Sequence, residues 1–173
     1  MQDILTKAKK IKLVIFDVDG VLTDGSLFFG DDGQEYKSFY ARDGLGMKLL
    51  QRTGVEIGII TARSSKVVLH RMENLGIKHV YQGSLDKASA FDEMLSKLNI
   101  KAEDTAYAGD DIIDLAVMQQ VGLAVAVQDA HAHIKQHAHW ITPHNGGRGA
   151  ARDLCELIME AQGTLTEQLN SFL

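Results

Sequence analysis

The sequence has little of what marks secreted, membrane or multidomain proteins. Its one cysteine, Cys155, cannot form a disulfide within the chain, so nothing indicates an oxidising compartment. Its one proline, Pro143, stands outside any Pro/Ser-rich stretch, so no linker divides the chain and we expect a single domain over residues 1–173. No apolar run approaches the roughly 20 residues that span a bilayer, and the first residues do not resemble a secretion signal. We therefore expect a cytoplasmic protein.

Positive charge is also scarce. The chain has 18 Lys and Arg residues against 23 Asp and Glu residues, a net charge of −5, and no basic run exceeds Lys9-Lys10. Such a charge pattern does not favour general binding to nucleic acids or to anionic membranes. With 45% hydrophobic and 24% charged residues, the composition is typical of a globular protein. It excludes disorder, collagen and coiled coil.

Apolar runs alternate with helical patterns along most of the chain. Between the runs, apolar residues recur at spacings of three and four, as in Phe91, Leu95 and Leu98, which is typical of amphipathic helices. Strands that alternate with helices predict an α/β fold, a parallel sheet with helices on both faces. The runs that predict buried strands are residues 12–16, 56–60, 105–108 and 123–127, with a weaker one at 79–81.

Residues 26–40 interrupt this alternation. Asp32-Gly33 stands between two aromatic-rich segments, which is a strong hairpin signal. The segment is too apolar for a ribbon that faces water on both sides. We favour a projecting hairpin flap or subunit contact over an edge hairpin that completes the sheet. The apolar residues concerned are Leu27, Phe28, Phe29, Tyr36, Phe39 and Tyr40.

Polar side chains follow the predicted strands at the points where they end. Because ligands of open α/β sheets bind beyond the carboxyl ends of the strands, we expect these side chains to meet. Clustered carboxylates repel one another unless a cation lies among them, and oxygen ligands without His or Cys favour Mg²⁺. A hydroxyl and a lysine nearby would bind an anion such as phosphate. The residues are Asp17, Asp19, Thr61, Arg63, Lys87, Asp110, Asp111 and Asp114.

Four motifs, in this order, resemble those of the haloacid dehalogenase (HAD) phosphatase superfamily. The first is Asp17-Val-Asp-Gly-Val-Leu-Thr23, and Thr61 and Lys87 match the second and third. The fourth is Gly109-Asp110-Asp111-Ile-Ile-Asp114. The resemblance implies a Rossmann-like HAD core and a phosphatase activity.

The resemblance also implies a two-step mechanism. Asp17 would attack the phosphorus to give an aspartyl-phosphate, and Asp19 would protonate the leaving oxygen and then activate water. Thr61 and Lys87 would bind the phosphoryl oxygens. The hydroxyl of Thr61 could also cap the helix that we expect to begin near Ser65.

The same resemblance implies a magnesium site. Mg²⁺ would be bound by the carboxylates of Asp17 and Asp110 and by the backbone carbonyl of Asp19. Asp114 would orient Lys87 or the water molecules bound to the metal. Asp111 is expected mainly to complement the dipole of the helix that follows it.

Between Thr23 and Thr61 there is room only for the hairpin and one helix, so no cap domain is expected. Residues 17–25, 39–46 and 144–153 resemble the capless phosphatases of 3-deoxy-D-manno-octulosonate (KDO) 8-phosphate, over essentially the whole chain. This resemblance implies hydrolysis of a sugar acid phosphate in lipopolysaccharide biosynthesis, in the cytoplasm of a Gram-negative bacterium.

Several residues are candidates for binding the sugar acid. Arg63 suits the carboxylate of KDO, whereas related nonulosonate 9-phosphate phosphatases tend to have glutamate there, and that substrate stays the main alternative. Arg71 is a candidate second ligand or a solvated helix residue. Gly146, Gly147 and Arg148 form a glycine-rich turn that could contact substrate or a neighbouring subunit.

The family resemblance implies a homotetramer with active sites at the subunit interfaces. The hairpin and the C-terminal segment, residues 163–173, would help to cover a neighbour's site, although this tail could also be disordered. A non-catalytic HAD-like oligomerisation module is a further alternative. His133 and His137 have a spacing that can bind metal, but no acid or cysteine follows, so we expect a polar helix face.

Overall fold

A six-stranded parallel sheet lies at the centre of the structure, a computed structural model in which residues 2–173 are described. All neighbouring strands of the sheet are parallel, in the order β5-β4-β1-β6-β7-β8. The five predicted strands are confirmed to within one residue at their ends, and β8 was not predicted. The strands are β1 Leu13–Phe16, β4 Glu56–Ile60, β5 His79–Tyr81, β6 Thr105–Gly109, β7 Leu123–Ala126 and β8 Trp140–Ile141.

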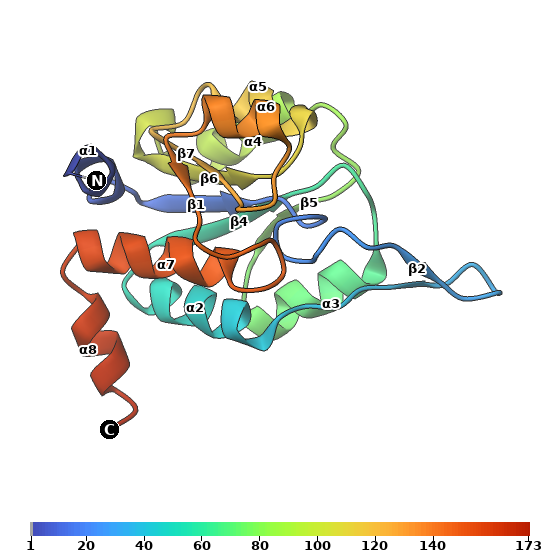
Figure 1. Ribbon diagram of the computed structural model, residues 1–173, viewed down its shortest axis with the longest axis horizontal. Helices are drawn as coiled ribbons and strands as arrows, with labels where there is room; N and C mark the ends of the chain where they lie inside the picture. The colour runs from blue at the N-terminus through green and yellow to red at the C-terminus, as the bar shows by residue number, and fades with distance from the viewer. Residues whose placement is uncertain (1) are drawn as a thin grey trace.

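Helices cover both faces of this sheet, as the sequence predicted (Figure 1). The helices α2, α3 and α7 lie on one face, and α4, α5 and α6 lie on the other. The expected Rossmann-like α/β architecture is therefore confirmed. The helices are α1 Gln2–Ala8, α2 Ala41–Arg52, α3 Lys66–Leu75, α4 Lys87–Leu98, α5 Leu115–Met118, α6 Ala132–His137, α7 Ala150–Ala161 and α8 Leu165–Asn170, with 3₁₀ turns η1 Ala102–Asp104 and η2 Ile112–Asp114.

Local chemistry sets where these elements begin and end. All four residues of β1 are buried, because helices pack on both of its faces, and this explains its continuous apolar sequence. Helix α4 begins where the Asp86 carboxylate accepts a hydrogen bond from Ser89 N at 3.2 Å. It ends at Asn99, whose φ of 52° is left-handed.

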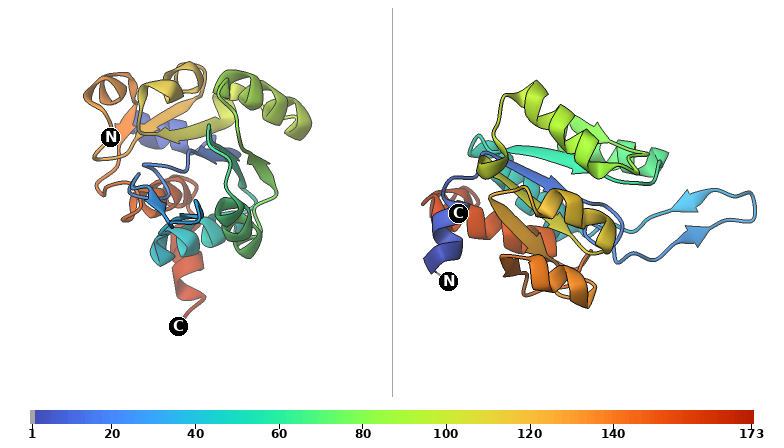
Figure 2. Two further views of the ribbon diagram at one scale, coloured as in Figure 1. Left: turned by 90° about the vertical axis from the view of Figure 1, so that its right-hand side faces the viewer. Right: turned by 90° about the horizontal axis from the view of Figure 1, so that it is seen from above.

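Residues 26–40 form the predicted hairpin as a separate antiparallel pair, β2 Phe28–Phe29 and β3 Glu35–Tyr36. The pair projects beyond the end of the sheet at which the central strands finish (Figures 1 and 2). The alternative, an edge hairpin that completes the main sheet, is therefore wrong. The side chains of both phenylalanines and of Tyr36 are more than half exposed, so the ribbon presents an apolar surface.

Three short elements had no clear sequence signal. Helix α1 packs its partly buried Ile4 and Leu5 against the core and contacts α7, although no continuous apolar run marks it. Strand β8 has only two residues. Residues 163–173, which the sequence left open between disorder and an interface, include α8, at the opposite end of the molecule from the hairpin (Figure 2). Among residues 2–173, no helix is long and apolar enough to cross a bilayer.

The packing of α4 against the sheet allows a stability test. Phe91 is fully buried on α4, so Phe91→Ala removes an aromatic ring from a packed core and should lower the free energy of unfolding by about 3–5 kcal/mol. Leu85 lies just before α4 but is 85% exposed, so Leu85→Ala should change the free energy of unfolding by no more than about 0.5 kcal/mol. Denaturant titration measures both values. Equal values would contradict the placement of α4.

Candidate active site

The polar residues predicted to meet lie around one cavity beyond the carboxyl ends of β1, β4 and β6. The cavity has a volume of about 210 Å³. Its wall includes most of the predicted catalytic and metal-binding residues, together with Arg63. The lining residues are Asp17, Asp19, Gly25, Thr61, Ala62, Arg63, Asp110, Asp111 and Ile113.

A buried ion cluster lies beneath this cavity. The Nζ of Lys87, whose side chain is 0% exposed, is 2.7 Å from Asp17 Oδ2 and 2.7 Å from Asp114 Oδ1. The hydroxyl of Tyr107 donates to the same Asp114 oxygen at 2.6 Å. The other oxygen of Asp114 accepts hydrogen bonds from the backbone N of Asp110, at 2.9 Å, and of Asp111. The structure therefore places Asp114 where it orients both Lys87 and the loop after β6.

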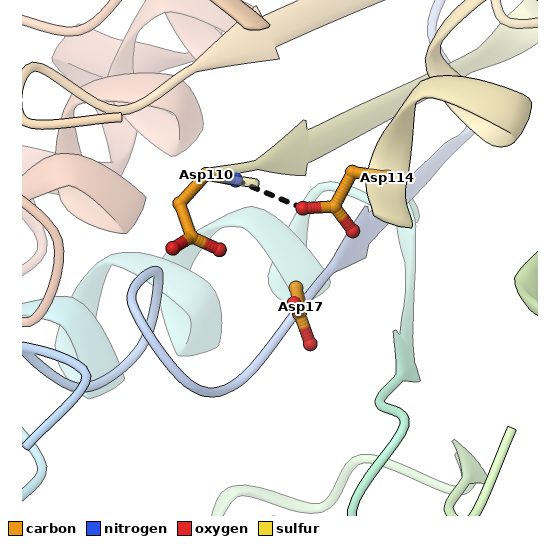
Figure 3. A group of neighbouring side chains, drawn as sticks. All are labelled: Asp17, Asp110 and Asp114. Atoms are coloured by element: carbon orange, nitrogen blue, oxygen red, sulfur yellow. Dashed lines mark hydrogen bonds between the residues drawn. The ribbon is translucent and has the colours of Figure 1, made fainter. Parts of the chain in front are cut away.

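Among residues 2–173, the carboxylates of Asp17, Asp110 and Asp114 form a group that could hold a metal ion (Figure 3). One oxygen of each lies within 4.8 Å of the others. Burial, followed by the charges of Asp114 and Asp17, raises the pKa of Asp110 to about 8. Burial raises the pKa of Asp17 to about 6, against the opposing effect of Lys87. One lysine does not balance three carboxylates, and an oxygen-only donor set of this kind fits Mg²⁺.

The loop after β1 approaches Asp110 closely. Gly20 has a φ of 86°, and a Cβ at this position would collide with the Asp110 carboxylate, so only glycine fits. Thr23 Oγ1 donates to Val18 O at 3.4 Å and accepts from Gly25 N at 3.2 Å. The first motif thus forms a compact turn that brings Asp17 and Asp110 to the same point.

On the hairpin side of the cavity, Asp19 belongs to a second group of charges. Lys37, which follows β3, forms an ion pair with Asp19 Oδ1 and another with Glu35 at 2.7 Å. Arg63 lies 3.4 Å from Glu35 and 4.0 Å from Asp19 Oδ2. Arg63 is therefore at the predicted place, but its guanidinium already has two acidic neighbours. Lys37, together with the guanidinium of Arg63, also holds the pKa of Glu35 below its usual value.

Two simpler roles for motif residues are settled by the local structure. Helix α3 begins at Lys66 with Ser65 at the cap position, so Thr61 does not cap this helix. Thr61 lines the cavity instead. Asp111 does cap the 3₁₀ turn that follows it, accepting from Ile112 N at 2.8 Å.

The remaining candidate substrate residues lie outside the cavity wall. Arg71, on α3, stacks over the Phe39 ring, 5.8 Å from its centroid. Gly146 and Gly147 pack against the backbone of the loop after β1, where a Cβ would clash, and Gly147 N donates to Val21 O at 2.8 Å. Arg148 forms a 3.2 Å ion pair with Asp24. The glycine-rich turn thus supports the first motif from behind.

His133 and His137 lie exposed on α6, with ring centroids 4.8 Å apart. Among residues 2–173, neither belongs to a group of three or more possible metal ligands. The structure thus places them on a polar helix face. Cys155 is fully buried on α7, as expected of a small core residue.

Sequence reasoning missed three residues of the site. Tyr107 lies inside the buried strand β6, where a tyrosine hydroxyl needs a hydrogen-bond partner, and that requirement was the available signal. Glu35 and Lys37 belong to the hairpin, where they resembled solvent-facing charges of an apolar ribbon. Only the return of the hairpin toward the sheet brings them to Asp19.

Comparison with known proteins identifies the class of protein that this fold and site define. The family model of haloacid dehalogenase-like hydrolases matches residues 77–154. A curated relative, the 3-deoxy-D-manno-octulosonate 8-phosphate phosphatase of Escherichia coli K12, is 48% identical over 165 residues, which are 95% of this chain and 88% of the relative. The chain belongs to the HAD-like hydrolases. Within them it is a member of the family of KDO 8-phosphate phosphatases, which are phosphoric monoester hydrolases.

Solved structures agree with this assignment. The Yersinia pestis phosphatase of the same name superposes with a TM-score of 0.94 at 46% identity, covering 95% of this chain and 89% of that one. The Moraxella catarrhalis phosphatase, solved with a magnesium ion, a phosphate ion and KDO, has a TM-score of 0.98 at 40% identity, covering 100% of this chain and 99% of that one.

The charge imbalance at the three carboxylates predicts a pH-dependent stability in the metal-free protein. Because the folded pKa of Asp110 is raised to about 8, the folded state keeps a proton that the unfolded state releases. The free energy of unfolding should therefore fall as the pH rises from about 4 to about 8. Mg²⁺ binds the ionised carboxylates, so it should restore stability most at the upper end of this range. At 100 times its dissociation constant the gain is about 2.7 kcal/mol.

Thermal unfolding at several pH values, with and without Mg²⁺, measures this effect. Asp110→Asn should flatten the pH dependence and reduce the magnesium-induced rise in Tm. The exposed Asp92→Asn on α4 is the matched control and should leave both unchanged. A metal-free wild-type protein whose Tm rises steadily between pH 5 and 8 would contradict the prediction.

Proposed function

We propose that residues 1–173 act as one capless domain, a Mg²⁺-dependent phosphatase that hydrolyses KDO 8-phosphate to KDO and inorganic phosphate. One observation carries the proposal: Asp17 is paired with Lys87 at the wall of a cavity and belongs to the acidic group that fits Mg²⁺. The relative solved with magnesium, phosphate and KDO supports the choice of substrate and metal.

We assign the role of nucleophile to Asp17. Its Oδ1 accepts a hydrogen bond from Val18 N at 2.6 Å and its Oδ2 is paired with Lys87, so the carboxylate is held in one orientation at the cavity wall. Attack of a carboxylate oxygen on phosphorus forms the aspartyl-phosphate as the bond to the sugar oxygen breaks. Thr61 lines the cavity and Lys87 contacts Asp17, so that a hydroxyl and an ammonium would stabilise the transferring oxygens.

We assign the roles of general acid and general base to Asp19. As the phosphorus–oxygen bond breaks, its carboxyl proton goes to the sugar oxygen, which leaves Asp19 ionised. A water molecule then attacks the phosphorus, gives its proton to Asp19, and releases Asp17 and inorganic phosphate. Both steps use one group, so the enzyme returns to its starting state.

Asp17, Asp110 and the backbone carbonyl of Asp19 would hold Mg²⁺. Asp114 would orient Lys87 instead, because its two oxygens are already bound by Lys87, Tyr107 and two backbone amides. When bound, the cation offsets the repulsion between the attacking carboxylate and the phosphate. Without the cation, the closely spaced and buried carboxylates of Asp17 and Asp110 have the raised pKa values described above.

Recognition of the sugar acid is assigned to Arg63, with Arg71 and the turn formed by Gly146, Gly147 and Arg148 as further candidates. Arg63 is the only one of these that lines the cavity among the described residues. A nonulosonate 9-phosphate is the alternative substrate. A non-catalytic oligomerisation module is disfavoured because Asp17, Lys87 and the acidic group are intact. The reaction would serve lipopolysaccharide biosynthesis in the cytoplasm.

The first test is Asp17→Asn. The amide keeps the shape of the side chain but is a far weaker nucleophile, so phosphate release from KDO 8-phosphate should fall by at least about 10³-fold. Unchanged circular dichroism and a cooperative melt show that the variant is folded. Normal turnover by this variant would exclude the proposed mechanism.

A substrate panel separates the alternatives with the wild-type chain. We expect a higher kcat/KM for KDO 8-phosphate than for a nonulosonate 9-phosphate. The reverse order would move the assignment to the nonulosonate branch, and no metal-dependent hydrolysis of any phosphate ester would favour the non-catalytic module.

We also propose a homotetramer in which the hairpin helps to enclose a neighbour's active site. The supporting observation is the exposed aromatic surface of β2 and β3, which projects from the cavity side of the molecule. Phe29→Asp places a charge on that surface and should reduce the mass measured by light scattering and the turnover, whereas Phe29→Leu should preserve both. A fully active wild-type monomer would contradict this prediction.

A further inference from the structure

Four charged side chains form a closed ring at the base of the hairpin. The ammonium of Lys37 contacts Asp19 and Glu35, and the guanidinium of Arg63 contacts the same two carboxylates. Positive and negative groups therefore alternate around the ring. The ring joins the loop after β1, the hairpin and the loop after β4.

The two cations of this ring are held very differently. The side chain of Lys37 is 1% exposed, and a lysine is almost never buried to this degree unless its ammonium is paired. Arg63 is 41% exposed, and its contact with Asp19 is the long one, at 4.0 Å. Lys37 is thus the fixed partner of Asp19, and Arg63 is free to turn toward a ligand.

The two carboxylate oxygens of Asp19 differ in their hydrogen-bond partners. Oδ1 is bound by Lys37. Oδ2 is buried and has no hydrogen-bond partner among residues 2–173. A buried polar atom without a partner is costly, and such an atom beside a ligand cavity points to a group that the ligand supplies.

We propose that Lys37 is a positioning residue for the acid step. By binding Oδ1, it fixes the rotamer of Asp19 and leaves Oδ2 as the oxygen that carries the transferred proton. Glu35 supports this arrangement by holding Lys37 from the other side. During the step, the proton moves from Oδ2 to the sugar oxygen as that oxygen takes the electron pair of its bond to phosphorus. This inference rests on the proposed function.

The leaving group provides a selective test. A sugar alkoxide needs a proton as it departs, whereas p-nitrophenolate does not, and general acid catalysis contributes about 10²–10⁴-fold. In single-turnover experiments with excess enzyme, Lys37→Met should slow release of the sugar from KDO 8-phosphate by about 100-fold. It should slow release of p-nitrophenol from p-nitrophenyl phosphate by less than about threefold. The saturating enzyme concentration should not change for either ester.

Two further variants complete the design. Lys37→Arg keeps the charge and should recover part of the sugar release. Lys12→Met is the matched control, because it removes an exposed lysine that is paired with Asp104 at 2.7 Å, away from the cavity. It should affect neither ester. If Lys37→Met has a much lower Tm than the wild type, Glu35→Gln serves as the test variant instead. It should slow release of the sugar by about tenfold, with a smaller effect on release of p-nitrophenol.

Three outcomes would overturn the inference. Equal slowing of both esters would show that Lys37 only stabilises the site. A change confined to the saturating enzyme concentration would make Lys37 a substrate ligand. No change in either rate would exclude a role of Lys37 in the acid step. A wild-type chain that releases no sugar from KDO 8-phosphate contradicts the proposed function instead. The same comparison is then made with whichever sugar phosphate the wild type hydrolyses.

Discussion

The site depends on the two ion pairs that the buried ammonium of Lys87 forms with Asp17 and Asp114. An uncompensated charge at this depth would cost several kcal/mol, so each of the three groups is tolerated only while the others are present. The pairing joins the end of β1, the start of α4 and the turn after β6. Because Asp114 also accepts from two backbone amides, the same interaction shapes the loop that carries Asp110.

This cluster explains why metal binding, stability and chemistry are coupled. Burial, together with the negative charge that Lys87 leaves uncompensated, raises the pKa values of Asp17 and Asp110. A divalent cation would therefore favour the ionised carboxylates, above all that of Asp110, whose pKa of about 8 lies above neutral pH. The nucleophile of the proposed reaction must be ionised, so the residues proposed to bind the metal would also prepare the attacking group.

Much of the fold could be predicted because its signals are local. The strand 13–16 is buried on both faces and therefore apolar throughout, and the motif residues follow strand ends, which parallel topology brings together. The ring of charges could not be predicted, because its partners lie on separate loops, and Lys37 belongs to a segment that is otherwise exposed. Strand β8 and helix α8 were missed because short elements near the surface carry little periodicity.

The position of Lys37 also bears on how the site would be enclosed in the proposed capless domain. Phosphoryl transfer benefits from the exclusion of bulk water. The hairpin that would meet a neighbouring subunit carries Lys37 at its base, which is paired with both Asp19 and Glu35. Any contact that displaces or orders the exposed end of this ribbon acts on the same strand that fixes the acid. In the proposed assembly, enclosure of the site and orientation of Asp19 are therefore carried by one element, so that a subunit interface supplies what a cap domain would otherwise provide.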